Sequence, residues 1–396
     1  MKIQSILVLL LFVCFSCKDN PAEENPVPTP KYRFFTSDEF AMGVDLSYVN
    51  EIEDHGGIYR DSSIIRDPFR IMKEHGSNMV RLRLWHNPVW VKTLYGSEQT
   101  HLYSGYADVE KSIQRAKALG MAVNLDFHYS DTWADPGNQK PPVAWENITS
   151  LQVLKDSVYN YTYSVLSKLN AKGLMPEMVQ IGNETNCGLM MTDTKEGFPD
   201  LNGCDGHWQE LGAVINSGIR AVRDVSAKST IKTKIALHVA GPENQEWWFG
   251  KIYTSGAVID FDIIGMSYYP LWSTYGFSDL PALIIKLKNN YNKKVMILET
   301  AYPWTTEGND SYNNLFGSQA PLSGCPFTKE GQAKLLVDLT KNVINAGGSG
   351  IMYWEPAYIS SQAKTQWGTG SPWENCTFFD FAGNALPSID YMRYSY

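Results

Sequence analysis

The stretch MVQIGNET, residues 178–185, joins a short apolar run to polar residues that follow it directly. The run Met178–Ile181 has the length of a buried strand, and Gly182 lets the backbone turn before Asn183 and Glu184. A carboxylate next to a buried strand is costly unless it has a use. The stretch KVMILET, residues 294–300, repeats this arrangement with Glu299. Two such strands can direct two carboxylates across one cleft if they belong to a parallel barrel.

The rest of the chain supplies the other strands of such a barrel. From about Phe40, short apolar runs alternate with helical patterns such as Leu151 to Leu169 and Ala213 to Val225. Eight strands are expected at 41–46, 79–84, 121–127, 178–181, 235–239, 263–267, 295–298 and 350–353. Alternation of this kind predicts a parallel sheet, and eight units predict an α/β fold with a single (β/α)8 TIM barrel. An open doubly wound sheet is the alternative, but no Gly-rich phosphate loop follows a strand.

Long segments after the third, fourth, seventh and eighth expected strands are rich in Trp, Gly and Asp. In a (β/α)8 barrel these are the extended βα loops on the active-site side. The composition of 43% hydrophobic and 13% aromatic residues is sufficient for a full-sized core. The net charge of −8 argues against nucleic acid as a partner.

The first residues resemble an export signal. Lys2 precedes an apolar run that is too short to span a membrane, and CFSC at 14–17 resembles a lipobox ending at the lipid-accepting Cys17. The acidic, proline-spaced segment that follows resembles the leader of Bacteroides-type surface lipoproteins. We therefore expect a signal peptide at 1–17, a tether at 18–39 and a catalytic domain at 40–396. The expected location is the outer membrane, lipid-anchored and exposed at the cell surface. A plain secreted protein is the alternative.

Four cysteines remain beyond Cys17. In an oxidising compartment Cys187 could pair with Cys204, and Cys325 with Cys376. Spacing alone does not establish this pairing, and no CxxC metal pattern is present.

Charged and aromatic side chains gather at the ends of the expected strands, as they do at the active-site rim of barrel enzymes. Two carboxylates that flank a glycosidic bond can cleave it when one stays protonated and the other stays ionised. Asn183 beside Glu184 offers a donor for a sugar hydroxyl, whereas Arg81 and a tyrosine can hold Glu299 as an anion. The candidate substrate-binding residues are Asp45, Arg81, Arg83, Trp85, His128, Trp133, Asn183, His238, Tyr268, Tyr269 and Trp354. Trp354 is expected to form the floor of a sugar subsite.

Several of these residues lie in longer runs that carry a family resemblance. The runs are RLRLW at 81–85, LDFHYSD at 125–131, WADP at 133–136, QIGNE at 180–184, IGMSYYP at 264–270, LETAYPW at 298–304 and YWEP at 353–356. They resemble glycoside hydrolase family 53, the endo-β-1,4-galactanases of the retaining clan A, from about Phe40 to Asp390. The resemblance implies that Glu184 is the general acid/base and Glu299 the nucleophile. It also implies a β-1,4-galactan substrate, no cofactor for catalysis and a monomer.

Some members of this family hold a structural calcium ion between the loops after the seventh and eighth strands. Here the corresponding run is GNDSYNN at 308–314, so the resemblance implies a possible Ca²⁺ site at Glu307, Asp310, Asn314 and Glu374. A polar loop without metal is the alternative.

Two other functions remain open at this point. A related enzyme of the same clan would act on mannan, xylan or glucan, and a non-catalytic lipoprotein would only capture glycan. The second would not need two glutamates on opposite strands.

Overall fold

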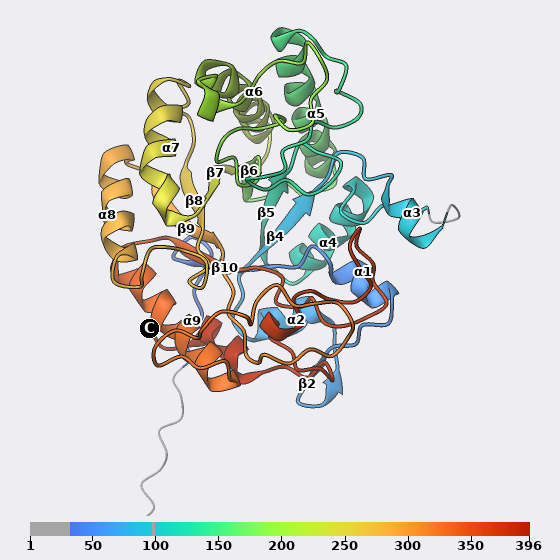
Figure 1. The fold of residues 1–396 in the computed structure, drawn as a ribbon, viewed down its shortest axis with the longest axis vertical. Coiled ribbons are helices and arrows are strands. Elements are labelled where there is room, and N and C mark those ends of the chain that lie inside the picture. The colour runs from blue at the N-terminus through green and yellow to red at the C-terminus, as the bar shows by residue number, and fades with distance from the viewer. Residues whose placement is uncertain (1–31, 97–99) are drawn as a thin grey trace, which may run out of the picture. The chain divides into compact units, whose positions relative to one another are not determined.

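The computed structural model describes residues 32–96 and 100–396. Within these residues, eight parallel strands close into a barrel in the order β1-β10-β9-β8-β7-β6-β5-β4 (Figure 1). The strands are β1 (Ala41–Asp45), β4 (Met79–Leu84), β5 (Ala122–Phe127), β6 (Met178–Ile181), β7 (Lys234–Ala240), β8 (Ile263–Ser267), β9 (Lys294–Glu299) and β10 (Gly350–Tyr353). The predicted TIM barrel is confirmed, and the expected strand bounds agree within one residue.

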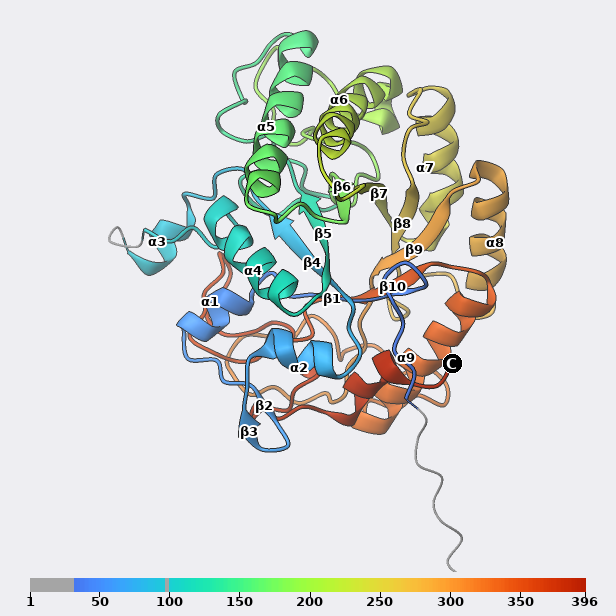
Figure 2. The ribbon, with the colours of Figure 1, turned by 180° about the vertical axis from the view of Figure 1, so that it is seen from behind.

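Helices surround this barrel. They are α1 (Val49–Asp54), α2 (Pro68–Glu74), α3 (Val91–Tyr95), α4 (Tyr106–Ala118), α5 (Leu151–Ala171), α6 (Trp208–Ala227), α7 (Pro242–Thr254), α8 (Leu280–Tyr291) and α9 (Lys329–Asn345). A small hairpin of β2 (Arg60–Asp61) and β3 (Ile64–Ile65) projects beside the barrel (Figure 2). Because buried apolar residues recur along one face of each long helix, these helices pack on the outside of the strands.

The interior of the barrel changes from apolar to polar along the strands. At the amino ends, side chains such as Met79, Met178 and Met352 form a compact apolar cluster. Two residues further along, β4 and β6 place Arg81 and Gln180 inside the barrel, since strand side chains alternate with a period of two. Buried polar groups need partners, so this upper layer forms one hydrogen-bonded network beneath the active-site rim.

The βα loops after β5, β6, β9 and β10 are the long ones, as expected. Short 3₁₀ turns at Gly203–Asp205, Glu374–Cys376 and Pro387–Arg393 interrupt them. No helix among the described residues is long and apolar enough to cross a membrane.

The described residues before the expected domain boundary at residue 40 belong to the same compact unit as the barrel. Arg33 donates its backbone N–H to the carbonyl of Arg393, and the Phe35 side chain is buried. Asp38 forms an ion pair with Lys234 on β7. Because of these contacts, the last part of the expected 18–39 tether belongs to the folded domain. The expected signal peptide, Cys17 and the tether before residue 32 lie outside the described residues.

Candidate active site

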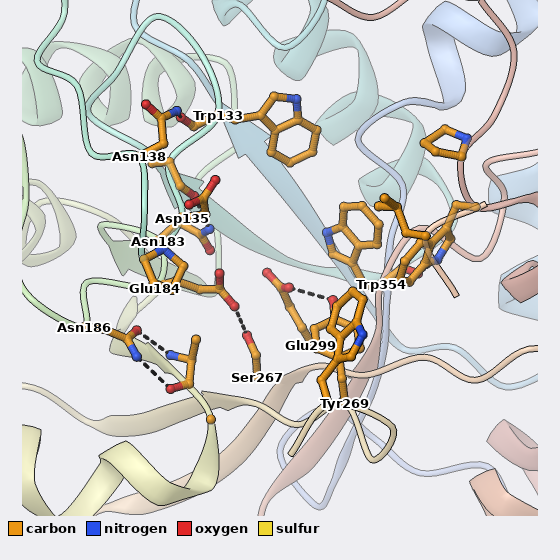
Figure 3. A pocket seen from close by; sticks show the side chains of 18 of the residues that line it. Trp133, Asp135, Asn138, Asn183, Glu184, Asn186, Ser267, Tyr269, Glu299 and Trp354 are labelled. Atoms are coloured by element: carbon orange, nitrogen blue, oxygen red, sulfur yellow. Dashed lines mark hydrogen bonds between the residues drawn. The ribbon is translucent and has the colours of Figure 1, made fainter. Parts of the chain in front are cut away.

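A cleft of about 1060 Å³ lies at the carboxyl ends of the barrel strands. Glu184 and Glu299 both line it, and Figure 3 shows their carboxyl groups directed toward one another from opposite sides. One oxygen of each glutamate lies within 4.8 Å of the other and of a ring nitrogen of His238. Retaining glycosidases keep their two carboxyl groups about 5–5.5 Å apart, whereas inverting enzymes separate them by about 6.5–9.5 Å. The spacing here is that of a retaining site.

Glu299 is held by a cation and a phenol. The Arg81 guanidinium approaches one carboxylate oxygen at 2.8 Å, and the Tyr269 hydroxyl donates to the other at 2.8 Å. Arg81 is itself fixed by Asp45 at 2.9 Å and Asp126 at 2.7 Å. Because the Arg81 guanidinium is held on several sides, it cannot move away from Glu299. The Glu299 carboxylate therefore keeps a constant orientation toward the cleft. The prediction that Arg81 and a tyrosine hold Glu299 agrees with this arrangement.

Glu184 has a different environment. It stands just after β6 with a φ of 46°, a left-handed conformation that non-glycine residues rarely adopt. The preceding Gly182 has a φ of 81°, and a Cβ there would lie 2.6 Å from Thr185. The Ser267 hydroxyl at the tip of β8 donates to the Glu184 carboxyl group, and His238 lies 2.9 Å behind that hydroxyl. Glu184 is therefore bonded to neutral donors, whereas Glu299 is bonded to a cation.

These surroundings separate the two carboxyl groups chemically. Burial and then the negative charge of Glu299 raise the pKa of Glu184 to about 8. Burial raises the pKa of Glu299 as well, but Arg81 and Tyr269 oppose that rise. Because Arg81 bonds Glu299 directly, the single proton that the pair retains near neutral pH lies on Glu184. One group can thus act as an acid while the other acts as a nucleophile.

Ser267→Ala tests the contact between β8 and Glu184. The serine hydroxyl stabilises the ionised carboxylate, so its loss raises the pKa of Glu184 above about 8. Because the first step needs protonated Glu184, we expect the alkaline limb of the kcat/KM profile to move to higher pH. Near neutral pH, kcat falls by about 3- to 10-fold through the lost hydrogen bond. Ser278→Ala, in the loop after β8 and outside the cleft, is the control and keeps the wild-type profile. A limb that stays in place or moves to lower pH contradicts this contact.

Among the other predicted site residues, Trp133, Asn183, Tyr269 and Trp354 line the cleft. Seven predicted contacts do not line it: Asp45, Arg81, Arg83, Trp85, His128, His238 and Tyr268. Their exposed fractions are all 2% or less, so they lie beneath the surface that a sugar would touch. In this structure the seven side chains fill the barrel or pack beneath the loops, and their contact with substrate stays a prediction.

The two buried histidines illustrate this position beneath the cleft. His128 accepts the backbone N–H of Ala134 at 3.2 Å and lies 3.1 Å from Asp126. His238 lies between Gln180 and Ser267, with 2.9 Å to each. Burial lowers the pKa of both imidazoles, which keeps them neutral. Both histidines contact residues that surround the two carboxyl groups.

Sequence reasoning missed Ser267, together with the cleft residues Asp135, Asn138, Asn186, Glu243 and Asn244. Ser267 could have been predicted from the sequence, because strand alternation puts Ile263, Gly265 and Ser267 on the same inward face of β8. The others stand on loops or at a helix start, where no periodic pattern indicates direction.

The predicted calcium ligands lie in the loops after β9 and β10. Glu307 is exposed, whereas Glu374 accepts the backbone N–H groups of Asn309 and Asp310 and the hydroxyl of Ser360. Asp310 accepts the N–H groups of Tyr312 and Ser371, each at 2.8 Å. Apart from Glu184, His238 and Glu299, no three acidic, histidine or cysteine side chains in residues 32–96 and 100–396 converge closely enough to hold a metal ion. The Glu374 and Asp310 carboxylates accept backbone N–H groups, whereas the Oδ1 of Asn314 is buried without a hydrogen-bond partner.

One of the two considered disulfides is present. Cys187 and Cys204 are bonded and close the loop that follows Glu184. Cys325 and Cys376 are separate buried thiols, so the second pairing is wrong. The Tyr353 hydroxyl links the two loops instead: it accepts the backbone N–H of Tyr302 at 3.0 Å and donates to the Cys376 carbonyl at 2.6 Å.

Comparisons with known proteins agree with this site. The family model described as Glycosyl hydrolase family 53 matches residues 41–392. An arabinogalactan endo-β-1,4-galactanase of Cellvibrio japonicus is 44% identical over 361 residues, which cover 90% of this chain and 91% of that protein. The GH53 catalytic domain of Ignisphaera aggregans superposes with a TM-score of 0.78 at 35% identity, covering 93% of this chain and 98% of that one. A fungal β-1,4-galactanase gives a TM-score of 0.72 at 29% identity, covering 89% and 98%.

Proposed function

The chain belongs to glycosyl hydrolase family 53, and from this membership we propose that it hydrolyses internal β-1,4-galactosidic bonds of galactan with retention of the anomeric configuration. The backbone of type I arabinogalactan in pectin is the expected polymer. The observation that carries the proposal is the pair of glutamate oxygens within 4.8 Å, of which only the Glu299 carboxylate pairs with Arg81. No cofactor is needed for this chemistry.

We infer a separate role for each carboxyl group. Glu299, ionised beside Arg81, attacks the anomeric carbon, while protonated Glu184 gives its proton to the departing oxygen. The first sugar product leaves, and a galactosyl ester on Glu299 remains. Glu184, now a carboxylate that accepts the Ser267 hydroxyl, removes a proton from water. That water then attacks the anomeric carbon from the face that the leaving group vacated, which restores the original configuration.

The proposal is tested by release of reducing ends from potato galactan, compared with mannan, xylan and cellulose. We expect activity on galactan at least about tenfold above that on the other polymers, with products of intermediate length from an early time. Preference for mannan, xylan or cellulose would place the enzyme elsewhere in the clan. Binding of galactan without release of reducing ends would make the protein a glycan-capturing lipoprotein.

We propose further that lipid on Cys17 anchors the protein to the outer membrane, with the catalytic domain exposed at the cell surface. The support is the CFSC run at 14–17, followed by an acidic segment that contains Pro26, Pro28 and Pro30. A polymeric substrate cannot enter the cell intact, so a surface location suits an endo-acting enzyme.

Cys17→Ala tests the anchor. The variant cannot accept lipid on a thiol, so galactanase activity should move from the membrane fraction to the soluble fraction while the specific activity stays unchanged. Cell fractionation followed by a galactan assay measures both. Cys325→Ala is the matched control and should remain in the membrane fraction. Membrane association of the Cys17 variant equal to that of the wild type would refute the anchor.

The loops after β9 and β10 are proposed to hold together without calcium. Because Glu374 and Asp310 bind backbone N–H groups across these loops, a chelator should leave both Tm and the initial rate on galactan unchanged. Asp310→Ala should lower Tm by about 2–6 °C, since it removes two hydrogen bonds to a charged acceptor. A fall in Tm with chelator, reversed by added Ca²⁺, would show that a calcium ion binds despite these contacts.

A further inference from the structure

Arg83 is a buried cation that the proposed mechanism does not use. It lies on β4 with an exposed fraction of 2%, and its Nε has no hydrogen-bond partner. Three aromatic rings surround its guanidinium: the central carbon lies 4.1 Å from the centroid of Trp133, 4.6 Å from Tyr48 and 4.6 Å from Trp85. A guanidinium enclosed by π faces is attracted to each of them, and more strongly when water is excluded.

The remaining contacts of Arg83 reach other loops. One terminal nitrogen donates to the Ser104 hydroxyl at 3.0 Å, and the other lies 3.6 Å from a carboxyl oxygen of Glu355. Tyr48 follows β1, Ser104 precedes α4, Trp133 follows β5 and Glu355 follows β10. One side chain on a rigid barrel strand thus touches the βα loops of four strands.

Two residues of these loops form one wall of the cleft. Trp133 and Trp354 both line it, with ring centroids 6.1 Å apart and planes inclined at 53° (Figure 3). Trp354 immediately precedes Glu355, which has a φ of 46°, a strained conformation for a non-glycine residue. Glu355 is also fully buried, 3.6 Å from Arg83. Arg83 therefore contacts Trp133 directly and Trp354 through its neighbour in sequence.

We propose that Arg83 is a positioning residue that holds Trp133 and Trp354 at the inclination needed to stack against successive galactose rings. The inference rests on the proposed function, since it assumes that these indoles bind galactan. Stacked CH–aromatic contacts require fixed ring planes, and Trp133 stands on a long loop whose conformation a barrel-borne cation can fix. Arg83 does not touch the sugar or the reacting atoms, so its effect falls on binding rather than on bond cleavage.

Arg83→Met and Arg83→Lys test the proposal. Methionine fills the space without charge, and lysine keeps the charge but lacks the planar fork. We expect the methionine variant to raise KM for galactan about tenfold with kcat within about twofold of wild type, and lysine to give a smaller rise. Quenching of tryptophan fluorescence by β-1,4-galactotriose should need a correspondingly higher concentration. The double variant Arg83→Met with Glu355→Gln removes the carboxylate left without its cation and should show the same rise in KM.

The control is Arg115→Met. Arg115 also stacks on a ring, 4.4 Å from the Phe69 centroid, and pairs with Glu53 at 2.6 Å, but it lies outside the cleft. This variant should lose thermal stability and keep the wild-type KM. An unchanged KM in both Arg83→Met and the double variant overturns the proposal, and so does a fall in kcat alone. An equal rise in KM in Arg115→Met also overturns it, because general loosening would then explain the effect. If the wild-type protein itself does not cleave galactan, that result contradicts the proposed function rather than the role of Arg83.

Discussion

Glu299→Ala should abolish turnover of galactan, with kcat reduced by at least about 10⁴-fold, the scale of the loss when a hydrolase loses its nucleophile. The variant keeps Arg81 and Tyr269, so the substrate can still bind, but no group can attack the anomeric carbon. Added azide can enter the space vacated by the carboxylate. It should attack the face that Glu299 occupied and give an α-galactosyl azide.

The product configuration is the decisive measurement for that variant, read by proton NMR of the isolated azide. A β-azide from Glu299→Ala would mean that Glu299 is the acid/base and that the two roles are exchanged. Wild-type product that appears first as the α-anomer would contradict retention itself. Tyr269→Phe provides a graded comparison, because it removes one hydrogen bond to Glu299 and should lower kcat by only about tenfold.

Glu184→Ala should lower kcat on galactan by about 10²–10⁴-fold, the usual contribution of a positioned general acid/base. The loss depends on the leaving group. An aryl galactooligosaccharide with a nitrophenolate leaving group needs no protonation, so its glycosylation step should stay fast while deglycosylation stalls. A burst of nitrophenolate followed by a slow steady state is therefore expected.

The configuration of the azide product also distinguishes the role of Glu184 from that of Glu299. In Glu184→Ala it needs no base, so it should release the galactosyl ester from Glu299, restore turnover and give the β-azide. Glu51→Gln is the matched control, because burial also raises the pKa of Glu51 to about 8, although Glu51 lies outside the cleft. Near-normal kcat in that variant separates the catalytic role of Glu184 from burial alone. Loss of the nitrophenolate burst in Glu184→Ala would contradict the assigned role.

The amino-acid sequence alone determined the architecture and placed the two candidate catalytic glutamates at one rim. Apolar strands have a length and a period that are visible in one dimension, and alternation with helices leaves few arrangements other than a parallel barrel. Because parallel strands end at the same rim, Glu184 and Glu299 could be placed together without coordinates. The Arg81 contact to Glu299 also followed, since a buried carboxylate needs a cation and Arg81 faces inward.

Only the tertiary structure decided which of the other rim residues face the cleft. Arg83, His128 and His238 have polar side chains suited to sugars, yet they lie under the surface and bind protein groups. Depth below the rim depends on how far each strand is shifted along its neighbours and on which loop covers it, and neither is a local property of the chain. The same reason applies to Asp310 and Glu374, whose carboxylates bind amides brought from another loop, and to Cys325 and Cys376, which remain separate thiols.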